Sequence, residues 1–327
     1  MVVFTYLVAK KMLGNKKALL FLIIAIFTSP LYLHAAIYYS DAISALFAIM
    51  TLYFYLKVQE SETLKNKVIY EILLGIALFI GLKIKITASF VIIAVIVCNI
   101  LNLKIKSLVK DLAITILVFL VLLVIFQVFV STKVISNKDA IKEYKMPIEH
   151  WIMMGLKGNG CYDSEDYAYT KANETYNKRK EADRKEIKRR LDEYDASSFI
   201  KHLTEKLKFT WSDGTYFAPV KLSISAIDKG PSYEFIAGRY QNLYKYIPQT
   251  MHISMLIFIV INGIDILKNK KYSSKDMILL IAMFGITMFL LIWENRSRYI
   301  LTLVPIMMIL QINGIEVLAD KIKKEIG

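Results

Sequence analysis

The stretch "LAITILVFLVLLVIFQVFVST", residues 112–132, contains 21 consecutive residues and no charged side chain. An α-helix rises about 1.5 Å per residue, so this segment would be roughly 30 Å long, the thickness of a bilayer's hydrocarbon core. The run is too long and too continuously apolar for a strand of a membrane β-barrel. It therefore predicts an all-α polytopic membrane protein.

Seven further apolar runs bring the expected number of spans to about eight. The runs lie at 18–38, 42–56, 68–82, 86–103, 112–132, 246–264, 277–293 and 299–315. The apolar start "MVVFTYLVA" is too short to span and indicates the remainder of an earlier segment. The expected organisation is an N-terminal transmembrane region (1–132), a mainly helical extracytoplasmic domain (133–245) and a C-terminal transmembrane region (246–327).

The net charge of +14 is distributed unevenly along the chain. The segment 133–245 holds 21 basic and 17 acidic residues, so most of the excess lies elsewhere, in short loops between apolar runs. Basic short loops face the cytoplasm, and alternating the spans places all of them on one side. The pattern predicts a multi-pass plasma-membrane protein surrounded by membrane lipids and gives no indication of nucleic-acid binding. The basic loops are 10–17, 57–67, 104–110, 268–275 and 321–324.

Four basic residues lie on the opposite, outward side, against that rule. Lys83 and Lys85 fall in one outward turn, and Arg296 and Arg298 fall in the turn "ENRSR" (294–298). Guanidinium groups match phosphate oxygens bidentately, which favours a phosphate-bearing lipid as ligand. The alternative is that these side chains only extend to the lipid headgroups from helix ends.

Two acidic residues share the outward turns. Asp41 separates two apolar spans, where it could act as a base, a metal ligand or a sugar ligand, or simply cap a helix. Glu294 most simply pairs with a neighbouring arginine. The scattered histidines give no metal-ligand set.

Aromatic and acidic residues recur in two loops of the 133–245 segment, "MPIEHWIMMGLKGNGCYDSED" (146–166) and "FTWSDGTYFAP" (209–219). Aromatic faces combined with carboxylates are common in sugar-binding sites, whereas Gly/Asp turns are also ordinary loops. The candidates for binding sugar or acceptor are His150, Trp151, Asp163, Asp166, Trp211 and Asp213.

The stretch "SSFIKHLTEKLKFTW" (197–211) predicts an amphipathic helix with serines at its start as cap candidates. Its apolar residues Phe199, Leu203, Leu207 and Trp211 recur every four positions. Such a helix could pack on its own domain or lie on the membrane surface.

Three of these motifs together resemble the GT-C superfamily of membrane glycosyltransferases. They are the outer-face "YSD" (39–41), "GLKIKITASF" (81–90) and "ENRSRYILTLVPIMMIL" (294–310). The chain is most similar to bacterial family 39, the protein-mannosyltransferase-like branch. Lys85-Ile86-Thr87 occupies the family's lysine position, and Arg298-Tyr299 and Pro305 match its late motif. The segment 133–245 matches only as a large extracytoplasmic loop.

The resemblance implies a GT-C-like helical bundle and an inverting glycosyltransferase of hexosyltransferase type. It would transfer a sugar from a polyprenyl-phosphate-linked donor to an extracytoplasmic acceptor: a cell-envelope glycan, lipid or protein. Lys83, Lys85, Arg296 and Arg298 would hold the lipid phosphate, Glu294 and Tyr299 would support them, and Asp41 would be catalytic. Divalent-cation use (Mg or Mn) varies within that family, and no ligand set in this sequence decides it.

The match also departs from the family pattern. The catalytic acid of the family lies in the first outer loop, and this chain is expected to lack the first span and that loop. Two other functions therefore remain open. One is a transporter or flippase of a lipid-linked saccharide, and the other is a non-catalytic subunit of an envelope-polymer machine.

Overall fold

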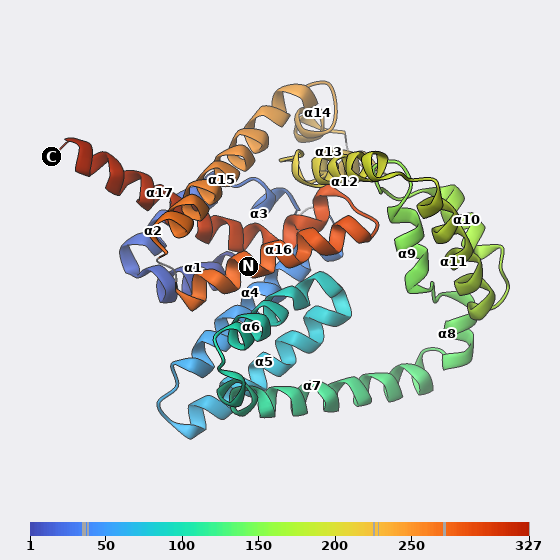
Figure 1. Cartoon of the computed structure of the whole chain (residues 1–327), viewed down its shortest axis with the longest axis horizontal. Coiled ribbons are helices and arrows are strands. Elements are labelled where there is room, and N and C mark those ends of the chain that lie inside the picture. Colours follow the sequence, from blue (N-terminus) through green and yellow to red (C-terminus); the bar gives the residue numbers. More distant parts are fainter. Residues whose placement is uncertain (35–36, 38, 225, 228, 271–272, 327) are drawn as a thin grey trace. The chain divides into compact units, whose positions relative to one another are not determined.

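Helices make up all the regular structure of the described residues, which are 1–326 apart from 35, 36, 38, 225, 228, 271 and 272 in a computed structural model. Figure 1 shows them in chain order. The α-helices are α1 (Val2–Leu13), α2 (Asn15–Phe27), α3 (Pro30–Leu33), α4 (Ser40–Gln59), α5 (Leu64–Ile84), α6 (Phe90–Leu101), α7 (Ile105–Lys133), α8 (Asn137–Glu143), α9 (Ile148–Gly155), α10 (Ser164–Lys171), α11 (Tyr176–Asp192), α12 (Ala196–Trp211), α13 (Ala218–Ser223), α14 (Pro231–Ile236), α15 (Gln241–Asn269), α16 (Ser274–Ile292) and α17 (Val304–Ile326). The 3-10 helices are η2 (Ile86–Ser89) and η3 (Ser297–Leu303).

The chain forms two units. Unit 1 comprises residues 1–119, 213–285 and 298–327, and unit 2 comprises residues 120–212 and 286–297. Unit 2 includes most of the expected extracytoplasmic domain, but it also takes in the end of α7 and the end of α16. The "ENRSR" turn is divided between the units after Ser297.

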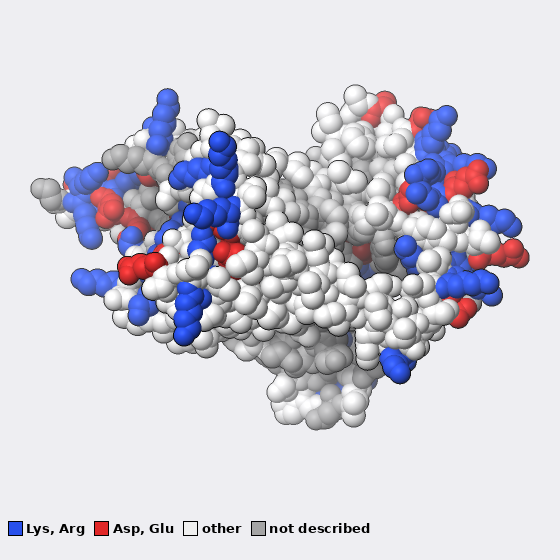
Figure 2. Space-filling model, turned by 90° about the horizontal axis from the view of Figure 1, so that it is seen from below, with Lys and Arg blue, Asp and Glu red and all other residues white. Residues whose placement is uncertain are grey.

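Among the residues that the structure describes, five helices are long and apolar enough to cross a membrane. They are α4, α7, α15, α16 and the continuous segment formed by η3 and α17. In the most apolar window of α7 only 6% of the residues are buried, as expected for a helix whose surroundings are lipid. Wide uncharged surface and separate groups of charged side chains are visible in Figure 2.

Two of the predicted spans are not single helices. The run 18–38 ends as a helix at Phe27, and Pro30 starts the short α3; residues 35, 36 and 38 lie outside the described part. The backbone leaves the helical region at Thr28 (φ −85°, ψ 86°), and Pro30, which has no N–H to donate, stands in the first turn of α3. The run 86–103 divides into η2 and α6. The run 68–82 lies within α5, which also carries Glu71 and several lysines and does not qualify as one of the five.

The core of unit 1 is built around α17, in which every residue from Val304 to Ile312 is buried. α15 runs along α17, α4 pairs with α5, and α1 contacts both α2 and α4. Gly314 permits the closest approach in this core, because a Cβ there would overlap the carbonyl oxygen of Phe258 on α15. α17 therefore lies at the centre of a group that includes α1, α2, α4 and α15.

Unit 2 is organised by α9, α10 and α11, which pack on one another, and by α12. α12 begins at Ala196, one residue before the predicted serines. Its N-cap is Asp195, and Ser198 completes a capping box with it. The charged stretch before it forms α11, in which Arg179, Asp183 and Arg190 are buried.

Candidate functional site

Asp41 is the centre of a charged cluster in unit 1. It is the second residue of α4 and only 1% exposed. Its Oδ1 forms an ion pair with Nζ of Lys85, the residue that ends α5. Its Oδ2 lies 3.6 Å from Nε of Arg298 in η3. Three elements that are distant in sequence therefore bring one carboxylate and two cations together.

Aromatic rings cover both cations of this cluster. Nζ of Lys85 lies 3.8 Å from the centroid of the Tyr299 ring. The guanidinium carbon of Arg298 lies 4.1 Å from the centroid of Tyr39 and 5.2 Å from that of Tyr299. Ring faces attract cations, so these rings hold Lys85 and Arg298 in a partly dehydrated position beside Asp41.

Arg298 has hydrogen-bonding capacity that the described residues do not use. The side chain is 9% exposed, and its Nη2 lies 3.5 Å from the hydroxyl oxygen of Tyr299. Its Nε and Nη1 form no hydrogen bond with any residue that the structure describes. At 3.6 Å, the contact between Nε of Arg298 and Oδ2 of Asp41 is electrostatic and too long for a hydrogen bond. Buried guanidinium donors of this kind suit an anionic ligand.

A chain of buried hydroxyl groups connects the same three elements. Ser44 donates to the carbonyl oxygen of Asp41 at 2.7 Å, and its Oγ lies 2.8 Å from Oγ1 of Thr302. Oγ1 of Thr302 in turn lies 3.0 Å from Oγ1 of Thr87. Each hydroxyl has one proton, so Thr302 must donate to Ser44 and Thr87 to Thr302. Thr302 thus ties α4 and η2 to η3, which carries Arg298.

Thr302→Val is expected to destabilise unit 1 by about 1–3 kcal/mol, because Ser44 and Thr87 both lose a buried partner. The measurement is thermal unfolding of the detergent-solubilised protein. Thr302→Ser keeps the hydroxyl group and is the matched control. Equal melting temperatures for the valine and serine variants would show that the hydroxyl chain contributes nothing.

A cavity of about 300 Å³ lies beside the cluster in unit 1. Its wall is mainly apolar. Tyr39 lines this wall, and its aromatic ring also covers the guanidinium group of Arg298. His34 also lines the cavity, is 5% exposed, and its Nε2 forms no hydrogen bond among the described residues. The lining residues are Met1, Pro30, Leu31, His34, Ile37, Tyr39, Ala42, Ile43, Leu46 and Leu301.

The other two basic residues that are predicted to face outward lie elsewhere. Lys83 is in the last turn of α5, with its Nζ 6.0 Å from the ring centroid of Phe79. Arg296 belongs to unit 2, and its Nε lies 3.8 Å from Oε1 of Glu294. The predicted pairing of Glu294 with a neighbouring arginine is therefore present. Of the four predicted phosphate ligands, the structure brings Lys85 and Arg298 together with Asp41.

Five of the six loop residues predicted to bind sugar lie in unit 2. His150 is fully buried, and its Nδ1 lies 2.7 Å from the hydroxyl of Thr170, which donates to Asp183 at 2.7 Å. Burial lowers the pKa of His150 and raises the pKa of Asp183 to about 6. The three hydrogen-bonded side chains lie in the core of unit 2.

Asp183→Asn is expected to stabilise unit 2 above about pH 6, by on the order of 2 kcal/mol. A raised pKa means that the folded state binds the proton more tightly than the unfolded state. The carboxyl group therefore lowers stability increasingly between about pH 4 and pH 6, and by a constant amount above. Limited proteolysis in urea at pH 5 and pH 8 measures the difference between the two proteins. If the stability difference between Asp183→Asn and the wild type does not grow with pH, the raised pKa of Asp183 is contradicted.

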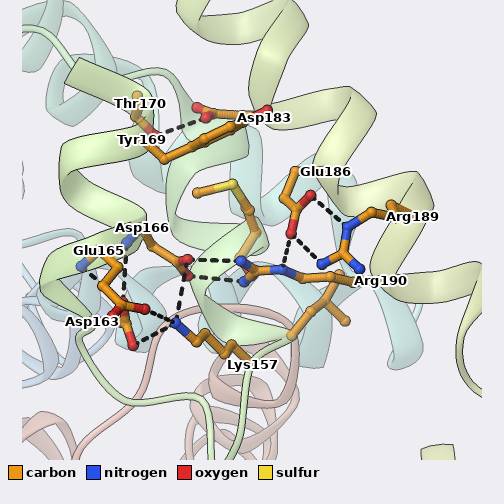
Figure 3. Close-up of polar contacts among 12 residues, drawn as sticks. Lys157, Asp163, Glu165, Asp166, Tyr169, Thr170, Asp183, Glu186, Arg189 and Arg190 are labelled. Carbon is orange, nitrogen blue, oxygen red and sulfur yellow. Dashed lines mark hydrogen bonds and ion pairs between the residues drawn. The ribbon is translucent and has the colours of Figure 1, made fainter. Parts of the chain in front are cut away.

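Asp163 and Asp166 are also engaged within unit 2, as Figure 3 shows. Asp163 caps α10 by accepting from the backbone N–H groups of Glu165 and Asp166. It also forms an ion pair of 2.8 Å with Lys157, which lowers the pKa of its carboxyl group. Asp166 is 4% exposed and binds both terminal nitrogens of Arg190, at 2.7 and 2.8 Å.

The remaining three loop candidates are split between the units. Trp151 stacks on Trp293 in unit 2, with ring centroids 6.3 Å apart. Trp211 is the last residue of α12. Asp213 lies in unit 1, where Oδ1 accepts from the backbone of Thr215 and Oδ2 accepts from the backbone of Phe217. Among the described residues, no three His, Cys, Asp or Glu side chains are grouped closely enough to hold a metal ion.

Sequence reasoning missed the hydroxyl residues and Lys206. A signal for the former exists, because Ser44, Thr87 and Thr302 each follow a charged member of the cluster by two to four positions. Lys206 is fully buried in unit 2, and burial lowers its pKa to about 8 although the nearby Glu294 raises it. Nothing in the pattern of α12 distinguishes this lysine from its exposed neighbours.

Comparison with known proteins identifies the membrane character of the chain. Residues 1–316 match the family model described as "Conserved hypothetical integral membrane protein". No curated protein and no solved structure matches the chain. The family match covers nearly the whole sequence and agrees with the five helices that can cross a membrane. The chain therefore belongs to this family of conserved hypothetical integral membrane proteins.

Proposed function

We propose that this protein is a GT-C-type membrane glycosyltransferase that uses a polyprenyl-phosphate-linked sugar as donor. The observation that carries the proposal is the cluster of Asp41, Lys85 and Arg298 beside an apolar cavity. A buried carboxylate beside two cations is suited to accept a proton and to stabilise a phosphate leaving group. The resemblance of the surrounding motifs to GT-C enzymes supports it.

In the proposed reaction, the hydroxyl oxygen of the acceptor attacks the anomeric carbon of the sugar from the side opposite the phosphate. The bond between that carbon and the phosphate oxygen breaks, and its electron pair stays on the polyprenyl phosphate. Lys85 and Arg298 stabilise this developing negative charge, with Nε and Nη1 of Arg298 as donors. The carboxylate of Asp41 accepts the hydroxyl proton. The configuration at the anomeric carbon is inverted.

The cluster faces the extracytoplasmic side, as the positions of the basic loops indicate, and the acceptor is an envelope glycan, lipid or protein. The cavity lined by Tyr39 and His34 receives part of the donor. The step uses side chains of the chain itself and assigns no role to a divalent cation.

The test is a transfer assay with the purified protein in proteoliposomes, supplied with radiolabelled polyprenyl-phosphate sugars and an envelope fraction as acceptor. The proposal predicts label in the acceptor fraction together with release of polyprenyl phosphate. Label that crosses the membrane while still attached to the lipid would instead identify a flippase. No transfer with any donor of a panel of common hexoses and pentoses would contradict an enzymatic role.

A further inference from the structure

Two apolar residues on one side of α12 are exposed, while Phe199 and Trp211 of the same helix are half-buried. Ile200 is 65% exposed and Leu207 is 37% exposed, while Leu203 between them is half-buried. These positions share one side of the helix. In a soluble domain an amphipathic helix turns its apolar side to the core, whereas Ile200 and Leu207 of α12 face outward.

His202, Lys206 and Thr210 form a buried strip along α12, which is held by specific hydrogen bonds within unit 2. Nζ of Lys206 donates to the carbonyl oxygens of Gly155 at 2.7 Å and Trp293 at 3.0 Å. The side-chain amide of Asn295 donates to the backbone carbonyl of Lys206 at 3.0 Å and to the hydroxyl of Thr210 at 2.7 Å. Because these partners are buried, rotation of the helix would leave several polar groups unpaired. The exposed apolar side is therefore fixed in its direction.

The same contacts attach α12 to the end of a membrane helix. Trp293 directly follows Ile292, the last residue of α16, and α16 is apolar and long enough to span. Gly155 packs on this end so closely that a Cβ would lie 2.7 Å from the carbonyl oxygen of Ile292. α12 is thus hydrogen-bonded to the point at which a span ends. A bilayer that α16 crosses would therefore have α12 at its interface.

The positions of the tryptophans also favour an interfacial location for α12. Its three tryptophans all belong to unit 2: Trp293 after the end of α16, Trp151 stacked on it, and Trp211 at the end of α12. Tryptophan is enriched where membrane helices meet the headgroups, because the ring is amphipathic. Lys201 and Lys208 are exposed on α12 and can reach lipid phosphates.

We infer that α12 is an interfacial membrane helix, whose Ile200 and Leu207 side inserts into the leaflet at which α16 ends. The occupant of the exposed side is lipid, since the helix is fixed to the end of a span and its apolar side is bordered by lysines. The inference does not depend on sugar transfer. It makes unit 2 a domain held against the bilayer.

The test is fluorescence quenching of the full chain in vesicles of phosphatidylcholine and phosphatidylglycerol. In a background of Cys98→Ser and Cys161→Ser, either Leu207→Cys or Glu205→Cys carries a bimane label. Glu205 is on the other side of α12 and is the matched control. Lipid with a nitroxide on its acyl chain should quench the label at 207 several-fold more than the label at 205, and aqueous iodide should show the opposite order.

Two results would overturn the inference. Equal quenching of both labels by iodide would place the apolar side in water. A label at 207 that neither quencher reaches would show that protein covers this side. If Leu207→Cys does not insert into the membrane, Ile200→Cys reports from the same side under the same conditions. A loss of glycosyl transfer in these variants, or its absence in the parent protein, changes neither readout.

Discussion

Asp41→Asn is expected to lower the rate of sugar transfer by at least about 100-fold, because the reaction loses the base that accepts the acceptor proton. Asparagine has nearly the same shape as aspartate but cannot take up this proton. The rate is measured in proteoliposomes at equal protein content. Asp320→Asn, an exposed carboxylate on α17, is the matched control and should transfer sugar at the wild-type rate.

The same variant leaves Lys85 and Arg298 without their buried counter-charge, which can also affect folding. A melting curve and the binding of polyprenyl phosphate separate the two effects. A folded Asp41→Asn protein that binds the lipid but does not transfer sugar agrees with a catalytic role. Transfer at the wild-type rate by Asp41→Asn would exclude Asp41 as the base.

Arg190→Met is expected to destabilise unit 2 by about 3–5 kcal/mol, the usual effect of breaking a buried ion pair. The guanidinium group of Arg190 binds both carboxylate oxygens of Asp166, donates to the carbonyl of Met153 and donates to Glu186. Methionine fills similar space and supplies no donor, so the carboxylate of Asp166 remains buried without its partner. Pulse proteolysis of the reconstituted protein in urea measures the change.

The neighbouring Arg189 provides the control for this prediction. Its ion pairs with Glu186 and Glu193 lie on the surface, where such pairs contribute little. Arg189→Met should therefore change the stability of unit 2 by less than about 1 kcal/mol. The double variant Arg190→Met with Asp166→Leu should recover most of the loss. Equal effects of the two arginine substitutions would refute a dominant role for the buried pair.

The sequence predicts the helical membrane architecture well because a span requires a long uncharged run, and such runs are visible without any tertiary information. The segments that became α4, α7, α15, α16 and α17 illustrate this. The helix break near Pro30 also has a cause in the sequence, but the length of the apolar run 18–38 favoured a single span. The division of the "ENRSR" turn between two units depends on packing and has no signal in composition.

The candidate site could also be predicted from the sequence only in part. Asp41, Lys85 and Arg298 are recognisable because charge at the outer edge of apolar runs is rare. Lys83 is not part of the cluster because it lies within the last helical turn, whereas Lys85 ends the helix in extended backbone and projects differently. In α12 the apolar spacing predicts the helix correctly. The direction of its buried side depends on carbonyl groups of Gly155 and Trp293, which are distant in sequence.

The most direct measurement is the affinity of a short-chain polyprenyl monophosphate for the protein in nanodiscs, compared between wild type and Arg298→Gln. Charge-assisted hydrogen bonds of the kind that Nε and Nη1 can form correspond to about a 10- to 100-fold change in Kd. Arg239→Gln, on an exposed arginine of unit 1, is the control. The account predicts weaker binding only for Arg298→Gln. Equal affinity for all three proteins, or equal binding of an uncharged polyprenol, would contradict it.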